Sequence, residues 1–132
     1  MISWLQVVYG TVLTGLLTAV LLWLASRWSR LTAFEGIASR RLVIIAAAGS
    51  AAAGALAWNA VLQATAARQF FHDLPFILFP VSWQDTGSGV FALALAATVL
   101  GFGPLASLPA RRVAALALLC GLGALLTDTY LY

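Results

Sequence analysis

Four long apolar stretches dominate this sequence and leave it too little polar surface to fold as a water-soluble globule. Of its 132 residues, 63% are hydrophobic and only 8% are charged, whereas a soluble domain carries about 25% charged residues. A helix of about twenty residues rises roughly 30 Å, which is the thickness of the hydrocarbon core of a bilayer. The sequence therefore predicts an all-α fold: one domain, residues 1–132, forming an integral membrane four-helix bundle.

The predicted transmembrane helices are residues 4–25, 42–66, 89–108 and 113–131. Only four residues separate the last two helices, so they must form an antiparallel hairpin, and the first two are expected to form another. Gly101, Gly103 and Pro104 near the end of the third helix predict a kink or an early stop there.

The longest connection, 68–88, is aromatic and apolar in its middle and polar at both ends. Its apolar part, 74–81, is far too short to cross a bilayer. We therefore expect an interfacial loop, lying in the headgroup layer or folded shallowly into the bundle.

The arginines predict how the chain is oriented. The chain has no lysine, and six of its seven arginines lie in the first and third connections: Arg27, Arg30, Arg40, Arg41, Arg111 and Arg112. By the positive-inside rule these connections are cytoplasmic, so both termini and the 68–88 loop are extracytoplasmic. Arginine without lysine in an Ala-, Leu- and Gly-rich chain indicates a bacterium, and hence its plasma membrane. The same arginines could also bind anionic lipid headgroups, but we favour a role in topology alone.

Small residues predict how the helices associate, because lipid supplies no hydrophobic drive and close packing must replace it. The second helix contains two series spaced by four: Ala46, Ser50, Gly54 and Trp58, and Gly49, Ala53 and Ala57. This concentration places the second helix at the centre of the predicted bundle.

Polar residues within the predicted helices collect toward the extracytoplasmic side. Asn59 and Gln63 share one face of the second helix, and Gln6 and Asp128 have comparable depth on the first and fourth. The candidate polar or ligand pocket comprises Asn59, Gln63, Arg68, His72, Asp73, Asp85 and Asp128. The alternative, which we favour, is hydrogen bonding between helices with ordinary interfacial charges nearby.

The sequence offers little for catalysis, metal binding or cofactor binding. His72 is the single histidine and Cys120 the single cysteine, whereas metal sites of known types need three or four ligands and dithiol chemistry needs two cysteines. No charged side chain lies close to the expected middle of a helix, which counts against a proton- or cation-coupled transporter. We expect no metal and no cofactor.

Three functions remain, and the residues favour a non-catalytic one. The first is an accessory or structural subunit of a larger membrane complex, docked through aromatic residues of the extracytoplasmic loop: Phe70, Phe71, Phe76, Phe79 and Trp83. The second is a small homo-oligomeric transporter or flippase-like carrier of a lipid-linked or neutral substrate. The third is a membrane enzyme with an outer-face site at His72, Asp73 and Asp85. The expected partners are membrane lipids and other membrane subunits or further copies of the chain, with no nucleic acid.

Overall fold

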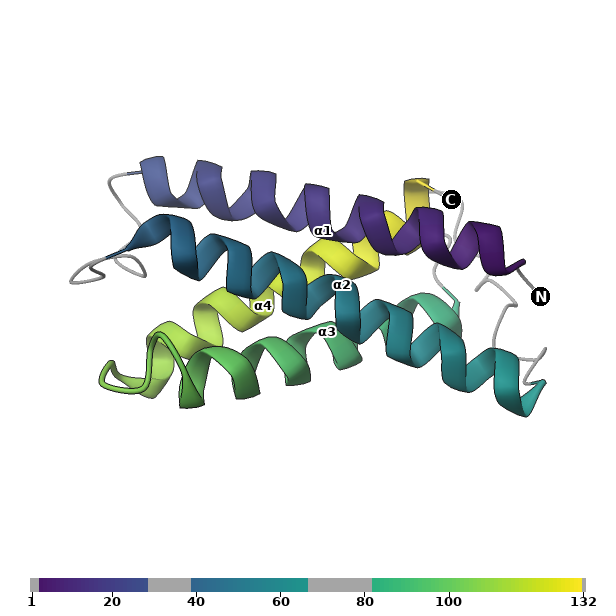
Figure 1. Ribbon diagram of the computed structural model, residues 1–132. Helices are drawn as coiled ribbons and strands as arrows, with labels where there is room; N and C mark the ends of the chain where they lie inside the picture. Colours follow the sequence, from purple (N-terminus) through teal and green to yellow (C-terminus); the bar gives the residue numbers. More distant parts are fainter. Residues whose placement is uncertain (1–2, 29–38, 67–81, 132) are drawn as a thin grey trace.

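Four helices make up the fold in the computed structural model, which describes residues 3–28, 39–66 and 82–131 (Figure 1). They are α1 (Trp4–Arg27), α2 (Arg40–Thr65), α3 (Trp83–Phe102) and α4 (Ala110–Leu126), which continues as the π-helical turn η3 (Thr127–Leu131). Counting α4 and η3 together, all four are long and apolar enough to cross a membrane. The all-α prediction is confirmed, and each helix overlaps one predicted transmembrane segment.

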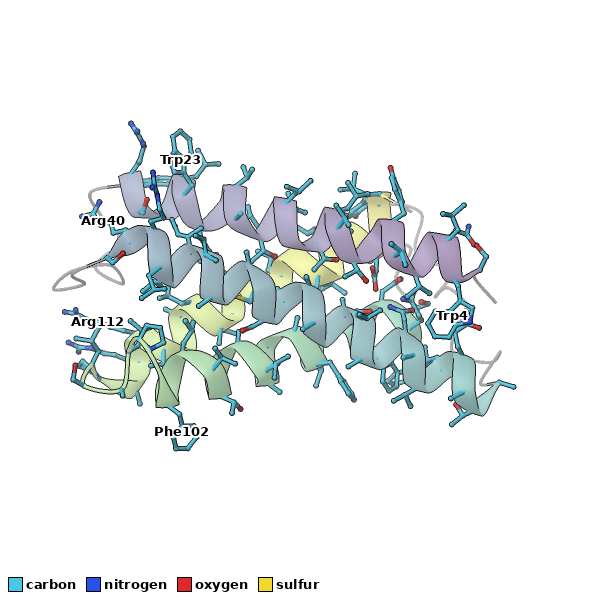
Figure 2. All side chains as sticks on the ribbon, in the orientation of Figure 1. Trp4, Trp23, Arg40, Phe102 and Arg112 are labelled. Atoms are coloured by element: carbon cyan, nitrogen blue, oxygen red, sulfur yellow. The ribbon has the colours of Figure 1, made fainter. Side chains whose placement is uncertain are left out.

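The two ends of the bundle differ in what they contain. Both chain termini lie at one end, together with the end of α2 and the start of α3; we call this the termini end (Figure 1). The opposite end, the arginine end, contains the described arginines Arg27, Arg40, Arg41, Arg111 and Arg112. Figure 2 shows Arg40 and Arg112 at this end and Trp4 at the other. The chain thus folds as two antiparallel hairpins.

The third helix begins six residues earlier than the predicted start at Gly89. Ser82 caps it, because its hydroxyl accepts a hydrogen bond from the Asp85 amide while the Asp85 carboxylate accepts one from the Ser82 amide. This reciprocal capping fixes a helix start. The helix also ends early, at Phe102, as the sequence predicts. A Cβ at Gly103 would lie 2.6 Å from the carbonyl oxygen of Val99.

Glycine lies at the contact in each of the four neighbouring helix pairs. The pairs are α1–α2 at Gly15, α2–α3 at Gly54, α3–α4 at Gly89 and Gly121, and α4–α1 at Gly123. The tightest contact between backbones is at Gly54, where a Cβ would lie 2.6 Å from the Cα and the amide nitrogen of Ala92. Small residues thus bring the helices together, which is how helices associate in lipid.

The second helix packs against all three others, but so does α4, and the two share the centre of the bundle. The two small-residue series of α2 also differ. Ser50 and Gly54 are buried, whereas Gly49, Ala53 and Ala57 are exposed and face away from the bundle. The core is formed mainly by small aliphatic residues of α2, α3 and α4, among them Ala47, Ala51, Ala92, Ala96, Leu116 and Ala117.

Candidate functional site

Four buried polar side chains meet inside the termini half of the bundle. Asn59 comes from α2, Gln84 and Ser88 come from α3, and Asp128 comes from η3. They expose between 0% and 6% of their surface. We call these four residues the polar cluster.

Gln84 is the hub of the polar cluster. Its side-chain amide donates to the Oδ1 of Asn59 at 2.9 Å and to the Oδ2 of Asp128 at 2.8 Å. Asn59 in turn donates to the carbonyl oxygen of Ala55 at 2.9 Å and to the hydroxyl of Ser88 at 3.3 Å. One amide group therefore joins three elements that are far apart in the chain.

The indole of Trp58 fixes the start of α3, and with it Gln84. The indole N–H donates to the backbone carbonyl of Gln84 at 2.9 Å. The ring lies against Gly87, where any Cβ would overlap it, and its centroid is 5.1 Å from that of Phe91. The missing side chain at Gly87 therefore leaves the space that the Trp58 ring occupies, although in the sequence this glycine resembles a loop residue.

The π-helical turn η3 carries Asp128. Few helices contain such a turn, but many of the turns that do occur lie at functional sites. The wider turn changes the direction in which a side chain points. The hydroxyl of Thr127 donates to the carbonyl oxygen of Gly123 at 2.8 Å, which holds the start of the turn to α4.

Hydrogen-bonding capacity is left over beside the polar cluster. Four buried oxygens have no hydrogen-bond partner among the described residues: the Oδ1 of Asp128 and the hydroxyls of Thr14, Thr18 and Thr129. Thr18 packs against Gly123. Because α1 and α4 are antiparallel, the next turn of α1 places Thr14 level with Thr127. These oxygens lie in the closed packing between α1 and α4, where Thr14 and Thr18 are fully buried.

The groups of this region are donors and acceptors of hydrogen bonds. A carboxylate oxygen and three hydroxyls accept from hydroxyl or ammonium groups, and hydroxyls also donate. In the described part of the chain, no three His, Cys, Asp or Glu side chains are grouped so that they could hold a metal ion.

The structure brings together only part of the predicted pocket. Asn59 and Asp128 both belong to the polar cluster. Asp85 is buried but serves as the cap of α3, and Gln63 lies half-buried one turn beyond Asn59. Gln6, expected at similar depth, is engaged at the start of α1, where its Oε1 accepts from the Ser3 amide at 2.8 Å.

Several predicted site residues lie outside the described residues. They are Arg68, His72 and Asp73 of the pocket, Phe70, Phe71, Phe76 and Phe79 of the docking surface, and Arg30. The remaining docking residue, Trp83, is 66% exposed at the first position of α3.

Two members of the polar cluster, Gln84 and Ser88, are absent from the predicted pocket. Their spacing of four puts them on one helical face, but only if the helix already exists at Gln84. The predicted helix start at Gly89 placed both residues in a loop, where a spacing of four does not indicate a shared face.

Searches against protein-family models, curated proteins and solved structures find no match.

Proposed function

We propose that the chain is a multi-pass protein of a bacterial plasma membrane, with the termini end extracytoplasmic and the arginine end cytoplasmic. Support comes from the four apolar helices and from the positive-inside rule applied to the five described arginines. Under this placement the 67–81 connection, which lies outside the described residues, is extracytoplasmic.

We further propose that the protein is a small carrier of a neutral or lipid-linked substrate, working as a homo-oligomer. The observation that carries this proposal is the Asp128 carboxyl group, which is 6% exposed and has one oxygen without a hydrogen-bond partner among the described residues. Ionisable groups inside a membrane are costly and usually functional.

The depth of the polar cluster supports a site within the membrane. At a rise of 1.5 Å per residue, Asn59 lies about 10 Å and Asp128 about 11 Å from the middle of its helix. Half of the hydrocarbon core is about 15 Å thick. The polar cluster therefore lies inside the hydrocarbon, in the extracytoplasmic leaflet.

The expected mode of binding follows from the groups between α1 and α4. The free oxygen of Asp128 and the hydroxyls of Thr14 and Thr18 accept hydrogen bonds from hydroxyl or ammonium groups of the substrate. Gln84 holds the other carboxylate oxygen, and this orients the free one. A substrate with a polyol or amine head matches these groups chemically, and the proposal requires α1 and α4 to separate to admit it, because Thr14 and Thr18 are fully buried.

Reconstitution into liposomes tests the carrier. The probes are a fluorescent phosphatidylethanolamine, whose flipping is followed by dithionite quenching, and radiolabelled glycerol, whose uptake is counted. We expect the wild-type protein to accelerate one of the two and N59L/Q84L to abolish that flux. Asp128→Asn preserves shape and should also lower the flux.

Gln6→Leu is the matched control, since Gln6 is a polar residue at the same end that lies outside the polar cluster. Its flux should equal that of the wild type. Unchanged flux in a folded N59L/Q84L protein, or no flux of either probe through the wild type, would end the carrier proposal.

A second candidate is a non-catalytic accessory subunit of a larger membrane complex. It is favoured by the way Gln84 ties α2, α3 and η3 together, since buried polar networks also serve purely to join helices. The exposed Trp83 beside the 67–81 connection supplies an aromatic contact for a partner. Crosslinking and blue-native gels test this candidate, which fails if the protein is found only alone or with copies of itself.

A further inference from the structure

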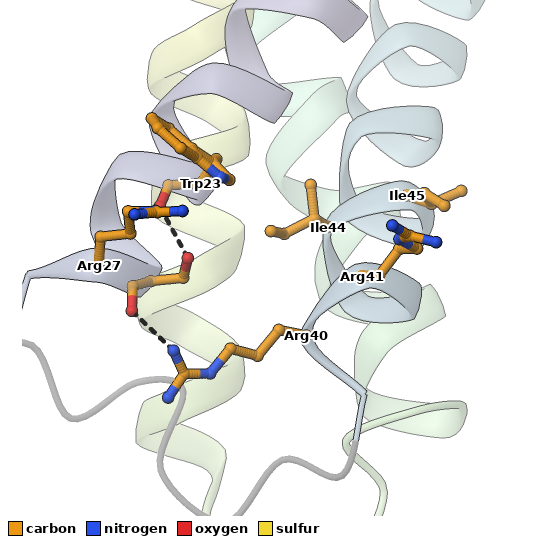
Figure 3. A pocket seen from close by; sticks show the side chains of 7 residues that line it. Trp23, Arg27, Arg40, Arg41, Ile44 and Ile45 are labelled. Atoms are coloured by element: carbon orange, nitrogen blue, oxygen red, sulfur yellow. Dashed lines mark hydrogen bonds between the residues drawn. The ribbon is translucent and has the colours of Figure 1, made fainter.

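A second site lies at the arginine end, remote from the polar cluster. A pocket of about 600 Å³ opens between the end of α1 and the start of α2. Three arginines, Arg27, Arg40 and Arg41, line it together with Trp23, Ile44 and Ile45 (Figure 3). Its volume falls within the range of about 300 to 1,000 Å³ that is typical of small-molecule sites.

Local contacts hold two of the arginines in place. The Arg27 guanidinium lies over the Trp23 ring, 4.6 Å from its centroid. Arg40 donates from Nη1 to the carbonyl oxygen of Ser26 at 3.0 Å and so links the two helices (Figure 3). Each guanidinium has five N–H donors in a fixed geometry, so Arg40 has further donors besides the one that it directs to Ser26.

The charge of the pocket selects an anion. Among the described residues, the acidic side chains are Asp85 and Asp128, and both lie in the termini half of the bundle. Three arginines therefore line this pocket, and no described carboxylate lies at their end of the bundle. Arginine is the preferred partner of phosphate because its N–H groups match two phosphate oxygens at once.

The depth of the pocket selects a lipid rather than a free anion. Measured from the middle of each helix, the arginines lie at about 17 to 19 Å, which is the headgroup layer. Trp23, Ile44 and Ile45 lie at about 11 to 13 Å, at the level of the first acyl carbons. Cationic groups in the headgroup layer and apolar groups nearer the middle of the membrane match the phosphodiester and the acyl chains of a phospholipid.

We infer that this pocket binds the headgroup of an anionic phospholipid. The guanidinium groups of Arg27 and Arg40 bind the phosphodiester between the two helices, and Arg41 adds positive charge at the rim. Trp23 and the isoleucines pack against the chains. A zwitterionic lipid is disfavoured, because its ammonium group would meet three positive charges. The inference rests on the proposed membrane placement but not on carrier activity, and it involves none of the residues of the polar cluster.

Native mass spectrometry of the detergent-purified protein tests the inference. The probes are dioleoylphosphatidylglycerol, dioleoylphosphatidylcholine and inorganic phosphate, each titrated separately. The wild-type protein should bind phosphatidylglycerol well above the other two. R40Q/R41Q should weaken that binding about 30-fold, given the contribution of each arginine near the surface.

The chain offers a matched control in R111Q/R112Q, an adjacent arginine pair at the same end that does not line the pocket. This variant should retain the affinity for phosphatidylglycerol to within about threefold. Circular dichroism checks that both variants are folded, and Arg27→Gln, on the other helix, provides a second test if R40Q/R41Q does not fold.

Three results would overturn the inference. Equal weakening by both arginine pairs would indicate diffuse surface attraction. Equal binding of phosphatidylcholine would remove the selectivity for an anionic lipid. Inorganic phosphate binding as tightly as phosphatidylglycerol would assign the pocket to a free anion.

Discussion

The two halves of the bundle are held together by different means. In the termini half, polar side chains are buried and bond across helices, with Gln84 joining Asn59 and Asp128. In the arginine half, the core is aliphatic, with Leu100 and Leu116 fully buried, and the cationic groups stay at the rim. Close packing of small residues, one of the forces that associate helices in lipid, occurs in both halves, with glycine contacts at Gly54, Gly89 and Gly123. Hydrogen bonds between side chains of different helices are added to it in the termini half. Because the termini half buries polar side chains in its interior, it is the better candidate for binding a ligand.

Gly54→Leu should cause the largest loss of stability, because it disrupts the contact between α2 and α3 near the middle of the bundle, where the two halves meet. Its side chain would collide with the Ala92 backbone and separate α2 from α3. Overpacking of this kind costs about 3 kcal/mol or more where backbone must move. Thermal unfolding in detergent measures the loss. Gly49→Leu, on the exposed face of α2 with no atom within 4 Å of the added Cβ, should leave stability unchanged.

Gln84→Leu should cause an intermediate loss of stability. It tests whether hydrogen bonds of the polar cluster stabilise the termini half. It removes two donors and leaves Asn59 Oδ1 and Asp128 Oδ2 buried without these bonds, which costs about 2 to 3 kcal/mol. Urea- or SDS-induced unfolding followed by circular dichroism measures the difference from the wild type. Thr98→Leu, on the exposed side of the same helix, is the comparison. A loss no larger than that of Thr98→Leu would mean that the polar cluster does not stabilise the termini half.

Thr14→Val should have the smallest effect on stability, within about 1 kcal/mol, because a methyl group of the same shape replaces a hydroxyl that has no partner in the described part of the chain. The carrier proposal nevertheless requires a lower flux of the transported probe. This variant therefore separates stability from function in the same half. Reduced stability together with unchanged flux would show that the Thr14 hydroxyl serves the fold and not the substrate.

Apolar length alone predicted the helices and their hairpins, because the bilayer thickness fixes how long such a stretch must be. The five described arginines likewise lie at one end of the bundle, as expected. The predicted start of α3 was wrong. Gly87 and Gly89 resemble loop residues in the sequence, which does not reveal that the Trp58 ring and Gly121 pack against them. The two small-residue series of α2 have the same spacing, so sequence could not tell the buried one from the exposed one.

The candidate site was harder to predict than the fold. Asn59 and Asp128 stood out because polar residues are rare in apolar helices. Their link through Gln84 depends on a contact between residues 44 positions apart, which no local pattern encodes. Ser88 became recognisable only once α3 was known to begin at Trp83.

The π-helical turn Thr127–Leu131 makes the C-terminus sensitive to chain length. A π turn has one residue more per hydrogen-bonded ring than an α turn. Deleting Thr127 would move Asp128 into the preceding position and swing its carboxylate by about 100° around the axis, away from the Gln84 amide. The tail would then form a more regular helix while the acidic group pointed elsewhere, so an in-frame loss of a single codon here would be more damaging than many substitutions.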